Sequence, residues 1–486
     1  MGRNSREGGK SFHRSLLEGG LGVLSSRVLG FVREFLTAYF FGASQATDAF
    51  FIAWKIPNLF RRVLGEGAFD RVLLAYLREG FNREFLQKVL FWSVFTSFLV
   101  AVFLAITAPF AVDLIYPNGA EEVKERAVSF LRIMVFYLPL ITITSFFAAL
   151  FQYFQRYLWS FLSQAVFNIG AISFLLLFEG ALGIYALVWS IIFGGLLQVA
   201  YILILSKRLR ILIPPKFGFH KKLVEYFRNL LPSFWSVGIG QISTLLEAFF
   251  ASFAGAGTLS HLYYAFRLYY LPVSVVAIVG SRVNFSSLVR SKDKGEIFEH
   301  LKRAVEALIY LLVPITLITL VVGESAVKIL YQHGAFSHAD TQKVALYLKI
   351  YICGLLGFSL YQLLLNLYHL QKRFFTAFFL SLPLVVVEIL VPLIGIFVFH
   401  TGGWVIALGT ALGGWVGFLT LCGLNRLCPF LGKVFIGTTR REFVKWMATL
   451  GSLIFVKATV SWNLLHFSFA ALWGLYYLYN FKKKSF

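Results

Sequence analysis

Long runs of apolar residues, interrupted by short clusters of charged and turn-forming residues, extend along almost the whole chain. A membrane-spanning helix needs about 20 mostly apolar residues, and fourteen segments meet or approach this requirement. The predicted spans are residues 16–41, 46–62, 88–112, 128–152, 160–178, 182–205, 230–253, 260–281, 304–322, 344–368, 376–399, 403–424, 443–461 and 464–481. The pattern predicts an all-α polytopic membrane protein with about 14 transmembrane helices.

An internal repeat divides these spans. Gly42-Ala43, Phe50-Phe51 and Pro57 recur as Gly255-Ala256, Tyr263-Tyr264 and Pro272, and Phe154-Gln155-Arg156-Tyr157 resembles Leu370-Gln371-Lys372-Arg373-Phe374. Six spans separate the copies, so both halves have the same topology, as in transporters built from parallel repeats. We expect two pseudo-symmetric six-helix lobes around a central cavity, plus two C-terminal helices. The predicted parts are an N-terminal lobe (1–206), a cytoplasmic amphipathic linker (207–229), a C-terminal lobe (230–425) and a C-terminal helix pair (426–486).

The basic residues are distributed unevenly between the two membrane faces. If the N-terminus lies inside and the spans alternate, the inner segments hold 34 Lys and Arg and the outer loops hold five. The positive-inside rule then places both termini in the cytoplasm, and it explains the net charge of +22 without a nucleic-acid partner. Residues 207–228 are typical of an amphipathic helix on anionic headgroups, although a solvated linker fits equally well. The basic N-terminus precedes a long apolar span, so no removable signal peptide is expected.

The composition excludes most other classes of protein. Charged residues make up 14% of the chain and hydrophobic residues 58%, whereas soluble domains carry about 25% charged residues. Cys353, Cys422 and Cys428 have no ligand spacing and are expected to be unpaired. We find no H-E-x-x-H, G-x-S-x-G or G-x-x-x-x-G-K-[ST] motif and no His cluster. We therefore expect no catalytic residue, no metal site and no cofactor, and any transport should be secondary.

Several charged residues fall within the predicted spans. Arg27, Arg33, Glu34 and Lys55 lie in the first two spans and Arg267 in the eighth, where each charge facing lipid would cost about 2.5–3.5 kcal/mol. The excess of cations favours a wet cavity that binds an anionic substrate, because arginine forks match phosphate oxygens. Ordinary buried ion pairs and snorkelling side chains are the alternative. Asp48, Arg61 and Arg62 lie near the ends of the second predicted span, where we expect them at the membrane–water interface.

Two acids lie within spans of the second half. Glu247 and Glu388, with Thr410 as a further oxygen donor, are candidates for a Na⁺ or H⁺ site that couples transport. The alternative is that both carboxyls are neutral and hydrogen-bonded to a neighbouring helix.

One stretch of sequence resembles a known family. Its segments are Ser26-Arg27-Val28-Leu29-Gly30-Phe31-Val32-Arg33-Glu34, Ala46-Thr47-Asp48-Ala49-Phe50-Phe51, Lys55-Ile56-Pro57-Asn58-Leu59-Phe60-Arg61-Arg62 and Glu66-Gly67-Ala68-Phe69. They resemble the opening signature of the MurJ family, the lipid II flippases of the MOP exporter superfamily. The resemblance continues at Phe167-Asn168, Leu231-Pro232 through Glu247, Tyr264-Ala265-Phe266-Arg267 and Gln332-His333-Gly334-Ala335-Phe336.

The resemblance implies further properties of the chain. It implies a V-shaped cavity and a groove for a polyprenyl tail at the two C-terminal helices. It assigns required roles to Arg27, Arg33, Arg267, Asp48 and Arg61, and it implies an occasional Na⁺ site that includes Glu247 and, by a looser match, Glu388. Departures from the family pattern are Phe266 before Arg267, the absence of an Asp-Thr-x-Thr-Pro turn at 371–376, and Glu rather than Asp at 247.

The resulting hypothesis is a flippase of the bacterial inner membrane. It moves undecaprenyl-diphosphate-linked peptidoglycan precursor (lipid II) to the outer leaflet by alternating access, as a monomer that can associate with the cell-wall synthesis machinery. Two alternatives remain at this point. One is a MOP-type exporter of another polyprenyl-linked oligosaccharide, and the other is a membrane glycosyltransferase, which the short outer loops disfavour.

Overall fold

The computed structural model describes residues 26–65, 68–239, 242–282, 294–370, 373–459, 470 and 472–473. Regular structure within these ranges is helical, which confirms the predicted fold class. Among the described residues, seven helices are long and apolar enough to cross a membrane, or eight if the bent pair α15 (His338–Cys353) and α16 (Leu355–Leu370) forms one span. Helices also cover most of the described parts of the other predicted spans, although most of the fourteenth lies outside the described residues.

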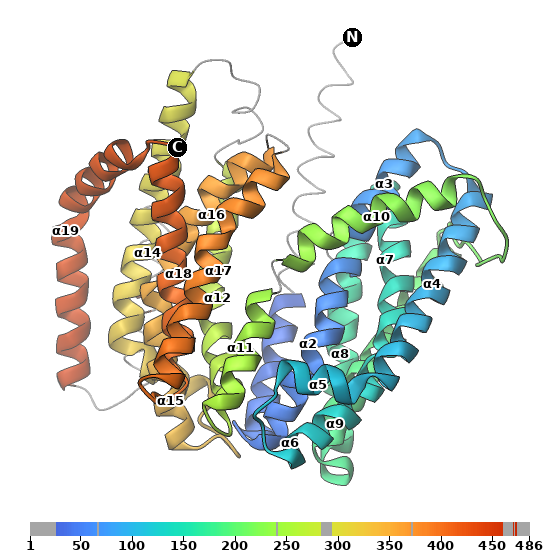
Figure 1. The fold of residues 1–486 in the computed structure, drawn as a ribbon, viewed down its shortest axis with the longest axis horizontal. Helices are drawn as coiled ribbons and strands as arrows, with labels where there is room; N and C mark the ends of the chain where they lie inside the picture. The colour runs from blue at the N-terminus through green and yellow to red at the C-terminus, as the bar shows by residue number, and fades with distance from the viewer. Residues whose placement is uncertain are drawn as a thin grey trace. The chain divides into compact units, whose positions relative to one another are not determined.

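The chain forms two compact units, Met1–Phe249 and Phe250–Phe486 (Figure 1). The predicted boundaries at 206, 229 and 425 stay predictions. In the first unit, helix 26–41 is followed by α2 (Gln45–Gly65), α3 (Ala68–Glu79), α4 (Arg83–Ile106), α5 (Ala108–Ile115), α6 (Glu121–Met134), α7 (Tyr137–Tyr153), α8 (Tyr157–Leu182), α9 (Ile184–Arg208), α10 (Lys222–Ile239) and α11 (Ile242–Phe253), which runs across the division.

Helix α7 forms the core of the first unit. It packs against α2, α3, α4, α8 and α9, and four of its large side chains, Tyr137, Phe146, Phe147 and Phe151, are fully buried. The hydroxyls of Thr142, Thr144 and Ser145 donate to carbonyls one turn earlier, so these polar residues are satisfied inside the apolar core. On α4, by contrast, large apolar side chains such as Phe98 and Phe103 are exposed, as expected for a helix that faces lipid.

The second unit contains α12 (Thr258–Arg282), α14 (Lys294–Tyr331), α15, α16, α17 (Phe374–Phe397), α18 (Trp404–Leu424) and α19 (Cys428–Thr459). Helix α18 packs against α15, α16 and α17, and α19 lies along α14. The three cysteines are free, as expected.

Corresponding helix junctions of the two halves share their backbone geometry. Arg156 before α8 has φ −98° and ψ 52°, and Arg373 before α17 has φ −88° and ψ 54°. Arg210 after α9 and Arg426 after α18 both have positive φ, 59° and 55°. Gly42 and Gly255, matched in the sequence repeat, also both have positive φ. The repeat is therefore visible in the turns that set the helix directions.

The segment after α9 differs from the amphipathic helix considered above. Residues 211–220 are not helical, and α10 begins only at Lys222. Pro214 and Pro215 lack the N–H donors that a helix needs, and Gly218 has φ 144°.

Candidate functional site

Helix 26–41 carries three of the predicted site residues. Arg27 is exposed, Arg33 is half-buried, and Glu34 is buried. The guanidinium carbon of Arg33 lies 5.6 Å from the centre of the Phe167 ring on α8. The next residue, Asn168, donates its side-chain amide to the Ser26 carbonyl at 3.2 Å. The Phe167-Asn168 pair therefore positions the helix that carries Arg27 and Arg33.

Lys55 on α2 contacts α11. Its ammonium donates to the Thr244 carbonyl at 2.5 Å and lies 3.0 Å from a carboxylate oxygen of Glu247. The side chains are 13% and 19% exposed, so the pair is largely removed from solvent. The structure thus pairs Lys55, predicted to bind the substrate, with Glu247, predicted to bind a coupling ion. The two residues are far apart in the sequence, which gave no reason to pair them.

The remaining predicted charges of the first unit lie toward the two ends of α2. Asp48 is fully buried in the first turn. Burial and, secondarily, the negative charge of Asp48 raise the pKa of the nearby Tyr116 hydroxyl. Arg61 donates to the side-chain oxygen of Asn58 at 3.1 Å, while the side chain of Arg62 lies outside the described residues.

Arg267 on α12 is half-buried and contacts one tyrosine in two ways. Its Nε and Nη2 donate to the Tyr263 hydroxyl at 3.1 and 2.9 Å, and its guanidinium carbon lies 5.0 Å from the ring centre. Tyr263 comes one helical turn earlier on the same helix, so Arg267 has a local partner even though the preceding residue is Phe266.

Glu388 on α17 packs against glycines of α18. A methyl group added at Gly413 would lie 3.3 Å from the Glu388 side chain, and one at Gly409 would lie 3.5 Å from its Cα. Thr410, between these glycines in sequence, has its hydroxyl 3.4 Å from the Ile406 carbonyl of its own helix. Within the described residues, no group of three or more His, Cys, Asp or Glu could hold a metal ion.

A buried polar pair on α12 and α15 was missed by the sequence analysis. His261 is 2% exposed, and its Nε2 lies 2.7 Å from Oδ1 of Asp340. Asp340 also completes a capping box with Ser337 at the start of α15. The Ser-x-x-Asp spacing could have indicated the helix start, but only the fold reveals that the cap also binds α12, the helix of Arg267.

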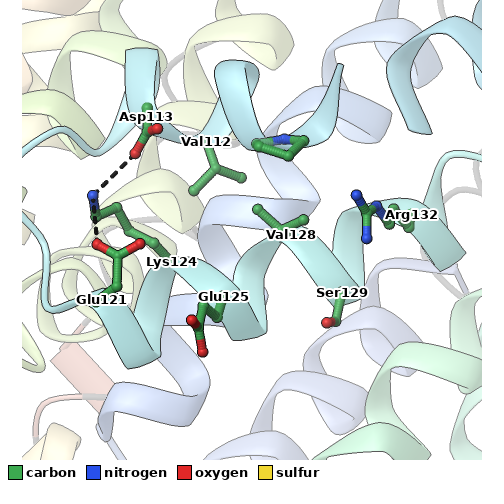
Figure 2. A pocket seen from close by; sticks show the side chains of 9 residues that line it. Val112, Asp113, Glu121, Lys124, Glu125, Val128, Ser129 and Arg132 are labelled. Atoms are coloured by element: carbon green, nitrogen blue, oxygen red, sulfur yellow. Dashed lines mark hydrogen bonds and ion pairs between the residues drawn. The ribbon is translucent and has the colours of Figure 1, made fainter. Parts of the chain in front are cut away.

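A pocket of about 400 Å³ lies between α5 and α6. Figure 2 shows Lys124 between Asp113 on α5 and Glu121 on α6, with 3.0 Å to each carboxylate. The full lining is Pro109, Val112, Asp113, Glu121, Lys124, Glu125, Val128, Ser129 and Arg132. None of the predicted site residues lines this pocket. Its lining contains three carboxylates and two cations, and this excess of negative charge does not suit a diphosphate.

These features define a multi-pass helical membrane transporter with cationic residues within its helices. The fold is similar to a MATE family multidrug transporter of the MOP superfamily, with a TM-score of 0.69 at 12% identity over 84% of this chain and 96% of that chain. It is also similar to a structure titled "Lipid II flippase MurJ, inward closed conformation", with a TM-score of 0.80 at 23% identity over 96% of this chain and 99% of that chain.

The sequence comparisons identify the family. The family model described as "Lipid II flippase MurJ" matches residues 37–477. A probable lipid II flippase MurJ of Thermotoga maritima is 32% identical over 82% of this chain and 83% of its own length. One of Aquifex aeolicus is 31% identical over 75% and 73%. The chain belongs to the MurJ family, which is a family of transporters rather than enzymes.

Proposed function

We propose that this protein flips lipid II from the inner to the outer leaflet of the bacterial inner membrane. Membership of the MurJ family supports the substrate, and the arginines within the helices supply the chemistry. The observation that carries the proposal is that Arg33 and Arg267 each lie against an aromatic ring. The cation–π contact keeps each guanidinium beside its ring, and an arginine fork matches the oxygens of a diphosphate.

The mechanism we propose is alternating access. The diphosphate headgroup binds Arg27, Arg33 and Arg267 in a central cavity, while the polyprenyl tail remains in lipid along the C-terminal helices. Both termini lie in the cytoplasm, as the distribution of Lys and Arg predicts. Rearrangement of the two lobes then exposes the headgroup to the outer leaflet.

The energy source is part of the proposal. Membrane potential, worth about 2.3 kcal/mol per charge per 100 mV, can bias states that differ by a few kcal/mol. A Na⁺ or H⁺ site at Glu247, Glu388 and Thr410 is the alternative, and the ion pair of Glu247 with Lys55 favours the potential. The protein works as a monomer that can associate with the cell-wall synthesis machinery.

A second candidate substrate is another oligosaccharide on a polyprenyl diphosphate. Its headgroup would present the same phosphate oxygens to the same arginines, so the residues on the protein side do not separate the two. The two substrates differ instead in the size of the sugar and in the peptide.

The test is an outer-leaflet accessibility assay for lipid II in cells depleted of this protein. Wild-type protein should restore accessibility. Arg27→Ala, Arg33→Ala and Arg267→Ala should slow it at least about tenfold, because a hydrogen bond to a charged group contributes about 1.5–3 kcal/mol. Arg126→Ala, which breaks only the exposed pair with Glu122, is the control. Normal accessibility after depletion, or full activity of all three arginine variants at normal protein levels, would disprove the proposal.

A further inference from the structure

The segment between α9 and α10, residues 209–221, is fixed to the start of α4 along much of its length. We call it the linker strap. The Trp92 indole donates to the Gly218 carbonyl at 2.9 Å, and the Lys88 ammonium donates to the Phe219 carbonyl at 2.9 Å. The Lys216 amide donates to the Gln87 carbonyl at 3.2 Å. The strap is therefore a structured surface element rather than a solvated linker.

Two aromatic side chains of the strap point outward. Phe217 and Phe219 are 70% and 67% exposed. The ring of Phe217 lies 5.4 Å from that of Phe91 and 5.8 Å from that of Trp92. Phe91 in turn stacks on Phe95, which begins the exposed apolar surface of α4. Phe217 thus extends the lipid-facing surface of a membrane-spanning helix.

The polar start of α4 places the strap at the membrane boundary. Lys88 forms an ion pair with Glu84 one turn earlier, and beyond Trp92 the helix is apolar. Aromatic rings at such a boundary belong to the headgroup region. The exposed rings of the strap therefore lie where phospholipid headgroups meet acyl chains.

The cations of the strap and the adjoining helix end form no close ion pair with a described acidic residue, although Glu84 lies near enough to Lys216 for their charges to interact. No Asp or Glu occurs between Glu179 and Glu225. Five exposed cations fall within this acid-free stretch, and none of them forms an ion pair with another described residue: Lys207, Arg208, Arg210, Lys216 and Lys221. Lys222, just beyond, is neutralised by Glu79 at 3.1 Å. These exposed cations lie in the sequence on both sides of the two exposed rings, so the strap carries a local excess of positive charge.

We propose that the linker strap is a binding site for anionic phospholipids of the bilayer. Lys216 and Lys221 contact the headgroup phosphate, and Phe217 and Phe219 insert among the acyl chains. Each Lys or Arg near an anionic surface contributes about 1 kcal/mol of attraction, and buried aromatic surface adds to it. Because the strap joins α9 to α10, a bound lipid would hold the connection between the two halves of the sequence at the membrane surface.

The experiment is native mass spectrometry of the full-length protein, titrated with phosphatidylglycerol or phosphatidylcholine of the same acyl composition. The wild type should retain phosphatidylglycerol preferentially. Lys216→Gln with Lys221→Gln should weaken that binding about 30-fold, the effect of two lysines at an anionic surface. Phe217→Ser with Phe219→Ser should weaken both lipids. The matched control is Lys328→Gln with Lys343→Gln, two exposed lysines of the second unit, which should change neither.

Equal retention of the two lipids by the wild type would overturn the proposal, as would wild-type phosphatidylglycerol binding by the lysine double variant. Undecaprenyl diphosphate serves as the competing probe. If the double variant lost this lipid but kept phosphatidylglycerol, the strap would belong to the substrate path instead. Binding is measured without transport, so its failure would be distinct from failure of the proposed flippase activity.

Discussion

Three of the cations within the helices each have a particular neighbour. Arg33 lies against Phe167, Arg267 against Tyr263, and Lys55 against Glu247. Although the two arginines lie in different units, each guanidinium lies over an aromatic ring. A guanidinium beside an aromatic ring keeps its full positive charge, which suits the binding of a phosphate group. An ion-paired ammonium has its charge compensated, which suits a structural role.

Lys55→Met should therefore destabilise the protein more than Lys55→Met combined with Glu247→Leu. Removing one partner leaves a largely buried carboxylate without its ammonium, at a cost of about 3–5 kcal/mol, whereas replacing both with apolar groups can be nearly neutral. Thermal unfolding in detergent, with both single variants and the double variant, measures the coupling. Additive losses of stability would show that the ion pair contributes nothing.

At the scale of elements, close contact between helices depends on small residues. A Cβ at Gly354, where α15 and α16 meet at 45°, would lie 2.4 Å from the Cα of Ala411 on α18. A Cβ at Gly414 would lie 2.9 Å from the backbone nitrogen of Phe358 on α16. Such approaches are typical of membrane helices, which pack through small residues because lipid offers no hydrophobic driving force between them.

Gly414→Ala should lower stability, because overpacking a well-packed contact costs about 1–3 kcal/mol. Gly423→Ala on the same helix is the matched control, since nothing lies within 4 Å of the added methyl, and a helical Gly→Ala change gains about 1 kcal/mol. Apparent melting temperatures in detergent should move in opposite directions. Equal shifts of the two variants would mean that α16 and α18 do not approach this closely.

For the whole molecule, the Lys55–Glu247 pair bears on how transport is driven. Because the ammonium already neutralises this carboxylate, flipping in proteoliposomes should be unchanged when choline replaces Na⁺. Dissipating a 100 mV potential should slow it, by at most about 50-fold per charge moved. In Lys55→Met the carboxylate lacks its ammonium, and a Na⁺ dependence should emerge. A severalfold loss of wild-type rate in choline would instead favour a Na⁺ site.

Much of the fold follows from the sequence because lipid imposes a strict rule. Every backbone donor and acceptor in the bilayer must be satisfied within the protein, so long apolar segments become helices. The described parts of the predicted spans are mostly helical, with short breaks such as Thr107 between α4 and α5. Gly42 and Gly255 reveal the repeat because a positive φ favours glycine. The strap was not predicted, because its extended course depends on hydrogen bonds from Lys88 and Trp92, over a hundred residues earlier.

The sequence by itself determined the class of protein, the helical spans and the candidate cations, because hydropathy and the cost of a charge in lipid are properties of local composition. Only the tertiary structure decided the partner of each charge. Arg33 meets Phe167, Lys55 meets Glu247, and His261 meets Asp340. These contacts join residues tens to hundreds of positions apart, and hydropathy carries no information about which helices become neighbours.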